Sequence, residues 1–282
     1  MKVRAYAKVN LALDVVRKRE DGYHDLEMIM APIALHDLII IDRIESGIEL
    51  TANTYRVPTD ERNIMYKVAK LMIDKYHIDG GVRMHVYKHI PSQAGLAGGS
   101  ADGAAVMRAI NKLYKLHLSN EGLAALGKEV GADIPFCIHN KIALVKGIGE
   151  DLTFINDNHF QAHLLLVKPK KGVSTKRCFE SLNIPESSHP DIDKMKQGIQ
   201  ENDYEKVVAS LGNTLETPSL KMVKDIEKIK DEMRSMGFDG ALMSGSGSCV
   251  FGITQDEELI ERAIPFFRAR YPFVRKTKIL ER

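Results

Sequence analysis

Residues 91–102 read Pro91-Ser92-Gln93-Ala94-Gly95-Leu96-Ala97-Gly98-Gly99-Ser100-Ala101-Asp102. The stretch follows a segment over 82–89 whose alternating apolar residues predict a strand, and it precedes a predicted helix over 101–116. Glycines let the backbone adopt positive φ and approach a ligand closely. Successive N–H groups and the start of the following helix can then bind phosphate oxygens. The stretch therefore predicts a phosphate-binding loop.

Several well-known nucleotide sites are excluded by the same residues. The chain contains no GxxxxGK[ST] motif and no GxGxxG dinucleotide fingerprint. No HRD or DFG element follows the loop, as a protein kinase would require. The loop therefore belongs to another class of phosphate-binding protein.

The remaining patterns predict an α+β chain without the regular strand–helix alternation of a doubly wound sheet. Alternation over 6–16 predicts a first strand, on which Lys8 and Asn10 project to the same side. We expect further strands over 26–33, 38–42, 47–52, 142–146, 163–167 and 273–280, and two strands around a glycine loop over 243–253. We expect further helices over 61–76, 120–130 (with Ser119 as its cap), 191–200, 204–211, 219–236 and 256–268. A domain boundary is expected in the turn-rich segment 147–158.

Composition argues against several classes of partner. The 282 residues include 40 Lys and Arg against 38 Asp and Glu, so the charge gives no argument for nucleic acid. No apolar run approaches the roughly 20 residues that span a bilayer. Three widely spaced cysteines, without a CxxC pair, indicate reduced thiols. We expect a cytoplasmic protein with a small-molecule substrate, and no nucleic acid or membrane as partner.

The loop resembles a known family. Its pattern Pro-x-x-x-Gly-Leu-x-Gly-Gly-Ser is similar to the second motif of the GHMP kinases, which include galactokinase, homoserine kinase and mevalonate kinase. Residues 5–11 resemble the first motif of that family, and residues 240–247 resemble its C-terminal glycine loop. The resemblance implies the two-domain GHMP kinase fold, with an ATP-binding domain over 1–152 and a substrate-binding domain over 153–282. It also implies ATP and Mg²⁺ as cofactors, mixed or antiparallel sheets, and packed helices.

Three short stretches point to one branch of the family. Residues 7–11 have its Ala-Lys-x-Asn-Leu form, 21–24 resemble its cytidine-binding segment, and 131–136 match its Gly-Ala-Asp-x-Pro motif. That branch phosphorylates the 2-hydroxyl of a cytidine diphosphate conjugate of methylerythritol, in the non-mevalonate synthesis of isoprenoid precursors. Asp133 is then expected to accept the hydroxyl proton. Lys8 is expected to keep Asp133 ionised and to stabilise the developing charge.

The resemblance also assigns the binding residues. The acceptor is expected to contact Asn10, Tyr23, His24, Phe179, Ser244, Gly245, Ser246 and Gly247, with the cytosine held by Tyr23, His24 and Phe179. ATP is expected along Lys88, Pro91, Ser92, Gln93, Ala94, Gly95, Leu96, Ala97, Gly98, Gly99, Ser100 and Ala101. Ser100 is the candidate Mg²⁺ ligand. Ala101 and Gly103 stand where Ser and Ala are frequent in the family, and Gly103 should weaken the helix start.

Two alternatives remain open at this point. The chain could act on a mevalonate- or homoserine-type acceptor, which would have no use for a cytosine clamp. It could also be a repurposed nucleotide-binding homologue without catalysis, although Lys8 and Asp133 are both present. Either a monomer or a homodimer is compatible with the sequence.

Overall fold

The computed structural model describes residues 1–156 and 159–281. Its strands and helices, in chain order, are β1 (Lys2–Lys18), β2 (His24–Ile44), β3 (Ile48–Ala52), α1 (Ile64–Lys75), β4 (Gly81–Tyr87), α2 (Gly98–Leu113), α3 (Asn120–Lys128), α4 (Ile134–His139), β5 (Ala143–Gly147), β6 (Asp151–Phe154), β7 (His163–Lys168), α5 (Thr175–Glu180), the 3₁₀ helix η1 (Ile184–Glu186), α6 (Ile192–Gln200), α7 (Tyr204–Ala209), β8 (Gly212–Asn213), α8 (Glu216–Met222), α9 (Asp225–Ser235), β9 (Gly240–Met243), β10 (Val250–Thr254), α10 (Glu257–Arg268) and β11 (Phe273–Lys278).

The chain forms two compact units that do not follow a single cut in the sequence. Unit 1 comprises Met1–Ala7, Leu35–Ser92 and Ala97–Asn140, and unit 2 comprises Lys8–Ala34, Gln93–Leu96 and Lys141–Arg282. Both β1 and β2 therefore contribute residues to each unit. The predicted division at residue 152 concerns which ligand each part binds, and it stays a prediction.

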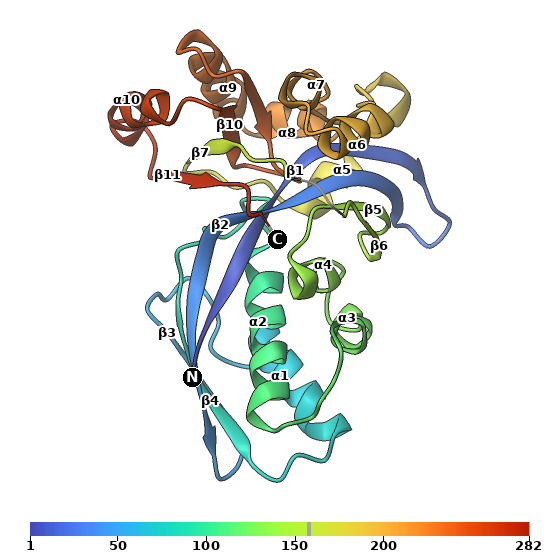
Figure 1. The fold of residues 1–282 in the computed structure, drawn as a ribbon, viewed down its shortest axis with the longest axis vertical. Coiled ribbons are helices and arrows are strands. Elements are labelled where there is room, and N and C mark those ends of the chain that lie inside the picture. Colours follow the sequence, from blue (N-terminus) through green and yellow to red (C-terminus); the bar gives the residue numbers. More distant parts are fainter. Residues whose placement is uncertain (157–158, 282) are drawn as a thin grey trace. The chain divides into compact units, whose positions relative to one another are not determined.

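Unit 1 is a sheet with helices packed beside it. The end of β2 pairs antiparallel with β4, so that Ile41 lies opposite Met84, and β3 pairs parallel with β4. Helices α1 and α2 pack side by side (Figure 1). Alternate residues of the strands, such as Ile39 and Val86, are fully buried, because one face of a strand supplies the core.

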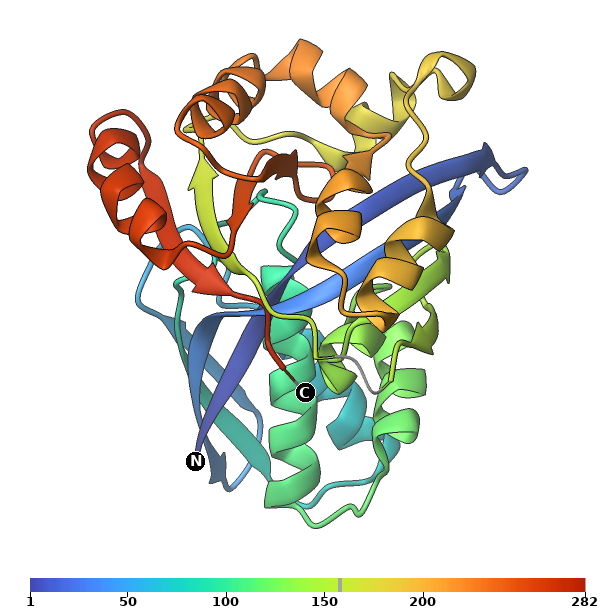
Figure 2. The ribbon, with the colours of Figure 1, turned by 45° about the horizontal axis from the view of Figure 1, so that its top comes forward.

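Unit 2 contains a second, wholly antiparallel sheet in the order β11-β7-β10-β9. Helix α9 packs on β9 and β10, and α10 packs on β7 and β11 (Figure 2). The start of β2 pairs with β5, which pairs with β6, and β1 pairs in parallel with β8. The predicted α+β class with mixed and antiparallel sheets is confirmed.

Several elements differ from the sequence prediction. The prediction of a single helix over 219–236 was wrong. Helix α8 ends at Met222, Val223 has φ −140° and ψ 89°, and a separate helix, α9, begins at Asp225. Asp225 and Glu227 in its first turn favour a helix N-terminus at this point. Segments 26–33 and 38–42 form one strand, β2, and the short elements α4, β6 and α5 were not predicted.

Candidate functional site

The predicted site residues are divided between the two units. Unit 1 contains Lys88, Pro91, Ser92, Ala97, Gly98, Gly99, Ser100, Ala101 and Asp133, whereas unit 2 contains Lys8, Asn10, Tyr23, His24, Gln93, Ala94, Gly95, Leu96, Phe179, Ser244, Gly245, Ser246 and Gly247. Each group is described within its own unit. The predicted pairing of Lys8 with Asp133 joins residues of different units and stays a prediction.

In unit 1 the glycine loop leads directly into α2. Ala97 precedes the helix with φ 55° and ψ 30°, and no side chain caps the helix start. The helix begins at Gly98, three residues earlier than predicted, so its first turn consists of loop residues. N–H groups in the first turn of a helix have no partner within it. They are therefore available to an anionic ligand.

Asp133 lies immediately before α4 in the same unit. The next residue, Ile134, is fully buried and lies against three glycines. A methyl group on one of them, Gly127, would come within 2.4 Å of its Cγ2. At the other end of α4, the Arg108 guanidinium of α2 donates to the carbonyl oxygen of Cys137 at 2.6 Å. Asp133 therefore starts a short helix that is anchored at both ends.

Ser100 lies close to the loop that carries Asp133. Its Oγ is 3.9 Å from the position of a methyl group built on Gly131. Among residues 1–156 and 159–281, no cluster of three or more His, Cys, Asp and Glu residues could hold a metal ion. A hydroxyl oxygen such as that of Ser100 is a donor that suits Mg²⁺ when phosphates and waters supply the other ligands. The residues present fit a phosphate-bound Mg²⁺ rather than a protein cage.

In unit 2, three segments that are distant in sequence meet. The Lys8 ammonium donates to the side-chain oxygen of Asn10, which confirms that the two residues share a face of β1. The backbone N–H of Asn10 donates to Ser244 Oγ at 3.3 Å, and that hydroxyl donates to the carbonyl oxygen of Gly95 at 2.9 Å. Lys8, Asn10 and Ser244 are almost fully buried. The three motifs of the sequence therefore supply one connected set of polar groups.

The approach of the two loops requires Gly95. Its φ is +71°, and a methyl group there would lie 1.8 Å from the carbonyl oxygen of Ser244. The backbone N–H groups of Ser248 and Cys249 donate to the carbonyl oxygens of Gln93 and Ala94, each at 3.3 Å. The middle of the glycine-rich loop is therefore fixed against the C-terminal glycine loop.

Side chains that the sequence analysis missed hold the C-terminal glycine loop. Asn213 donates to the carbonyl oxygens of Met243 and Gly245, both at 2.8 Å. Ser219 of α8 donates to the carbonyl oxygen of Ser246 at 3.1 Å. The sequence around Asn213 and Ser219 matches no motif, so only the contacts of these residues reveal that they position the loop.

The predicted cytosine-binding residues are only partly brought together. The rings of His24 and Phe179 stack, with centroids 4.9 Å apart and an angle of 28° between their planes. Burial, with a smaller contribution from Lys18, lowers the pKa of His24. Tyr23 is 60% exposed, and its backbone N–H donates to Asp21. The pair is thus formed by His24 and Phe179, with Tyr23 open to solvent.

Lys88 has a role that the sequence did not predict. Its ammonium donates to both Asp37 and Asp102, and the three side chains are at most 9% exposed. The sequence analysis assigned no role to Asp37 or Asp102, because a single aspartate in a strand or a helix is not part of a recognisable motif.

Comparison with known proteins relates both units to one family. Residues 63–141 match the family described as the GHMP kinases N terminal domain, and residues 189–272 match the GHMP kinases C terminal family. The chain is 44% identical over 279 residues to the 4-diphosphocytidyl-2-C-methyl-D-erythritol kinase of Clostridium novyi (strain NT), covering 98% of this chain and 99% of the relative.

Solved structures agree with these sequence matches. A crystal structure of 4-(cytidine 5'-diphospho)-2C-methyl-D-erythritol kinase is 30% identical, covers 100% of both chains and superposes with a TM-score of 0.85. Homoserine kinase from Cytophaga hutchinsonii, covering 99% of this chain and 94% of its own, superposes with a TM-score of 0.78 at 17% identity. The second likeness concerns the fold alone.

Proposed function

Because this chain belongs to the GHMP kinase family, as its two domain matches and its 44% identical relative show, we propose that it transfers the γ-phosphate of ATP to the 2-hydroxyl of 4-diphosphocytidyl-2-C-methyl-D-erythritol. Likeness to a relative over nearly its whole length is the observation that carries the proposal. The stacked pair of His24 and Phe179 supports it, because an aromatic pair suits a nucleobase acceptor.

The nucleotide is proposed to bind along Pro91–Ala101. The uncapped start of α2 supports this, since its free N–H groups and the positive end of the helix dipole attract phosphate. Mg²⁺, when bound to the phosphates, would neutralise part of their charge, with Ser100 as the protein ligand. The division into a nucleotide part (1–152) and an acceptor part (153–282) is proposed on the same basis.

Asp133 and Lys8 are proposed to carry the chemistry. The Asp133 carboxylate accepts the proton of the 2-hydroxyl, the acceptor oxygen forms a bond to the γ-phosphorus, and the bond from that phosphorus to the β–γ bridging oxygen breaks to release ADP. Lys8 stabilises the charge that develops on the acceptor oxygen. Its burial and its contact with Asn10 support this role, because a fixed cation acts more strongly than a mobile one.

The acceptor is proposed to contact Asn10, Tyr23, His24, Phe179 and the loop Ser244–Gly247. For a cytosine to lie between His24 and Phe179, two ring-to-ring gaps of about 3.5 Å would be needed, about 7 Å in all. The rings are 4.9 Å apart, so the proposal requires either that they separate or that the base stacks on an outer face.

The setting of the protein is proposed from its thiols and its helices. Cys137, Cys178 and Cys249 are buried, and none of them forms a disulfide within the described part of the chain, which suits a reducing cytoplasm. In the part of the chain that the structure describes, none of the helices is both long and apolar enough to cross a membrane. A monomer or a homodimer is proposed for the assembly.

The direct test is release of ADP by the purified protein with 4-diphosphocytidyl-2-C-methyl-D-erythritol, mevalonate or homoserine as acceptor. We expect turnover with the cytidine acceptor alone, and a loss of about a hundredfold or more in kcat for Asp133→Asn with ATP affinity retained. Turnover with mevalonate or homoserine instead would establish a different acceptor. Near-normal kcat in Asp133→Asn would reject the role of Asp133.

A further inference from the structure

A buried charge cluster in unit 1 joins the residues just before the proposed nucleotide loop to the helix that follows it. Asp37 in β2, Lys88 just after β4 and Asp102, the fifth residue of α2, meet through the Lys88 ammonium. Their side chains are 0%, 9% and 5% exposed, respectively. Fully enclosed charges are costly unless they are paired, so such a cluster needs an explanation.

The cluster holds both ends of the loop. On the entry side, Asp37 Oδ1 accepts from the backbone N–H groups of His89 and, at 2.8 Å, Ile90. The backbone N–H of Lys88 itself donates to the side-chain oxygen of Asn53 at 2.9 Å. On the exit side, Asp102 fixes the second turn of α2 to the same ammonium. The Lys88 ammonium therefore links the residues just before Pro91 to the helix that begins at Gly98.

Lys88 also lies close to the start of the helix. A methyl group on Gly98 would be 3.6 Å from the Lys88 ammonium nitrogen and 2.9 Å from Ile90 Cγ2. The first turn of α2 therefore packs directly on the residues that the cluster holds in place.

The charges in the cluster do not balance if both aspartates are ionised. Asp102 Oδ1 is buried and has no hydrogen-bond partner among the described residues. Burying an ionised carboxylate that has one oxygen without a hydrogen bond costs more free energy than burying a neutral carboxyl group. Burial, opposed by Lys88 and reinforced by Asp37, raises the pKa of Asp102 to about 8. Burial disfavours the charge on Lys88, but the two carboxylates outweigh it and raise its pKa. The Lys88 ammonium therefore stays charged between the two carboxyl groups.

We propose that Asp37, Lys88 and Asp102 are positioning residues for ATP, which hold the two ends of the glycine loop in the arrangement that binds the phosphates. This inference rests on the proposed function. It has one measurable consequence: the affinity for the nucleotide depends on the cluster, whereas the affinity for the acceptor does not.

The test measures the Kd of ATP by calorimetry at pH 7, together with the KM of the acceptor and the melting temperature. Lys88→Met removes the cation that joins the two carboxyl groups and should raise the Kd of ATP at least tenfold, with the KM of the acceptor unchanged. Lys88→Met combined with Asp37→Asn should recover part of that loss, because the Asn side-chain oxygen can still accept from the N–H groups of His89 and Ile90 while the unpaired carboxylate is removed. Asp102→Asn alone removes one of the two carboxyl groups that hold Lys88 and should raise the Kd of ATP, but less than Lys88→Met does.

The exposed pair Lys70–Asp74 on α1 of the same unit provides the matched control. Lys70→Met and Asp74→Asn should leave the Kd of ATP unchanged. If Lys88→Met fails to fold, Asp102→Asn still decides, because the inference requires its Kd for ATP to rise while the KM of the acceptor stays unchanged. Equal Kd values in the wild type and the folded cluster variants would overturn this inference alone. A wild-type chain that binds no ATP would overturn the proposed function and this inference with it.

Discussion

His24 and Phe179 lie ring against ring, with centroids 4.9 Å apart, although one residue begins β2 and the other lies in α5. The contact places an aromatic pair where a nucleobase is proposed to bind.

Replacing Phe179 with Ala should raise the KM of the cytidine acceptor. Stacking of a base on an aromatic ring contributes about 1–3 kcal/mol, so we expect an increase of roughly 5- to 150-fold, with the KM of ATP little changed. Initial rates at varied acceptor and ATP concentrations measure both values.

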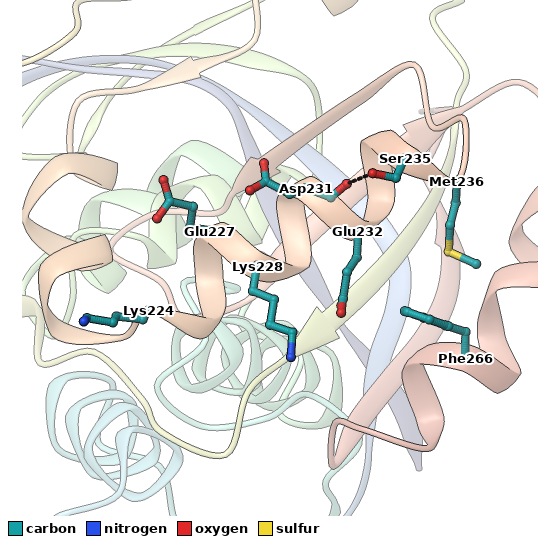
Figure 3. A pocket seen from close by; sticks show the side chains of 8 residues that line it. All are labelled: Lys224, Glu227, Lys228, Asp231, Glu232, Ser235, Met236 and Phe266. Atoms are coloured by element: carbon teal, nitrogen blue, oxygen red, sulfur yellow. Dashed lines mark hydrogen bonds between the residues drawn. The ribbon is translucent and has the colours of Figure 1, made fainter.

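Phe266 offers a matched control for that substitution. It is a partly buried phenylalanine of α10 that lines an open hollow beside α9, together with residues such as Lys228 and Met236 (Figure 3). Phe266→Ala should leave the acceptor KM unchanged. Equal effects of the two substitutions would contradict a specific role for Phe179.

Gly95→Ala should disrupt the junction of the two glycine loops in unit 2. The added methyl group would lie 1.8 Å from the Ser244 carbonyl oxygen, so the backbone must move. We expect a loss of stability of at least about 3 kcal/mol and strong loss of turnover, measured by chemical denaturation and ADP release.

Gly47→Ala separates this steric effect from backbone strain. Gly47 has a similar φ of +79°, but nothing lies within 4 Å of its added methyl group. It should cost only about 1–2 kcal/mol, the penalty for a left-handed residue. Similar losses for the two variants would show that strain rather than contact dominates at Gly95.

Gly103 should resist replacement by Ala, the residue frequent in the family at that position. Ala gains up to about 1 kcal/mol of helix propensity, but its methyl group would lie 2.7 Å from Ile64 Cγ2. Overpacking typically costs about 1–3 kcal/mol, so Gly103→Ala should be destabilising in denaturation experiments. Adding Ile64→Leu removes the branched methyl group and should restore stability. Full stability of Gly103→Ala alone would refute the steric explanation.

His189 should stabilise unit 2 more strongly at low pH. Its Nδ1 lies 2.6 Å from Asp14 Oδ1, and this hydrogen bond, with one to the Ile184 carbonyl oxygen, raises the pKa of His189 above 6.5. A raised pKa means that the stabilisation is complete below pH 6.5 and is lost as the pH rises through the folded-state value. His189→Ala should cost about 1 kcal/mol at pH 6 and less at pH 9, because the pair is partly exposed.

Denaturation at the two pH values measures that difference. His159→Ala, which removes an exposed histidine 3.4 Å from Glu281, should change the free energy of unfolding by less than about 0.5 kcal/mol at both. A loss for His189→Ala that grows with pH would contradict the assignment of the Asp14 contact.

Local sequence signals predicted much of the fold. Ser119 caps α3 as expected, with its hydroxyl accepting from the Gly122 N–H at 3.1 Å. The family resemblance drawn from three motifs is confirmed by the matched family descriptions and the nearly full-length relative. These predictions succeeded because helix caps, the alternation of apolar residues in strands and glycine motifs each depend on only a few consecutive residues.

Other features had no local signal. The break at Val223 was missed because its apolar stripe continues a helical pattern, while the chain turns there to start α9. Asp37 and Asp102 were missed because each is an ordinary residue until Lys88 joins them.

The sequence by itself determined the family, the position of the glycine-rich loop and the residue types proposed for phosphoryl transfer, since these depend on short motifs and on the order of the motifs along the chain. Only the tertiary structure decided that Asn10, Gly95 and Ser244 share one hydrogen-bonded network, and that His24 stacks directly on Phe179. It alone decided that Lys88 is enclosed between two carboxylates. The burial of a side chain affects whether it is charged, and its distance from other groups decides which of them it contacts. Burial and distance both depend on segments that meet only when the chain folds.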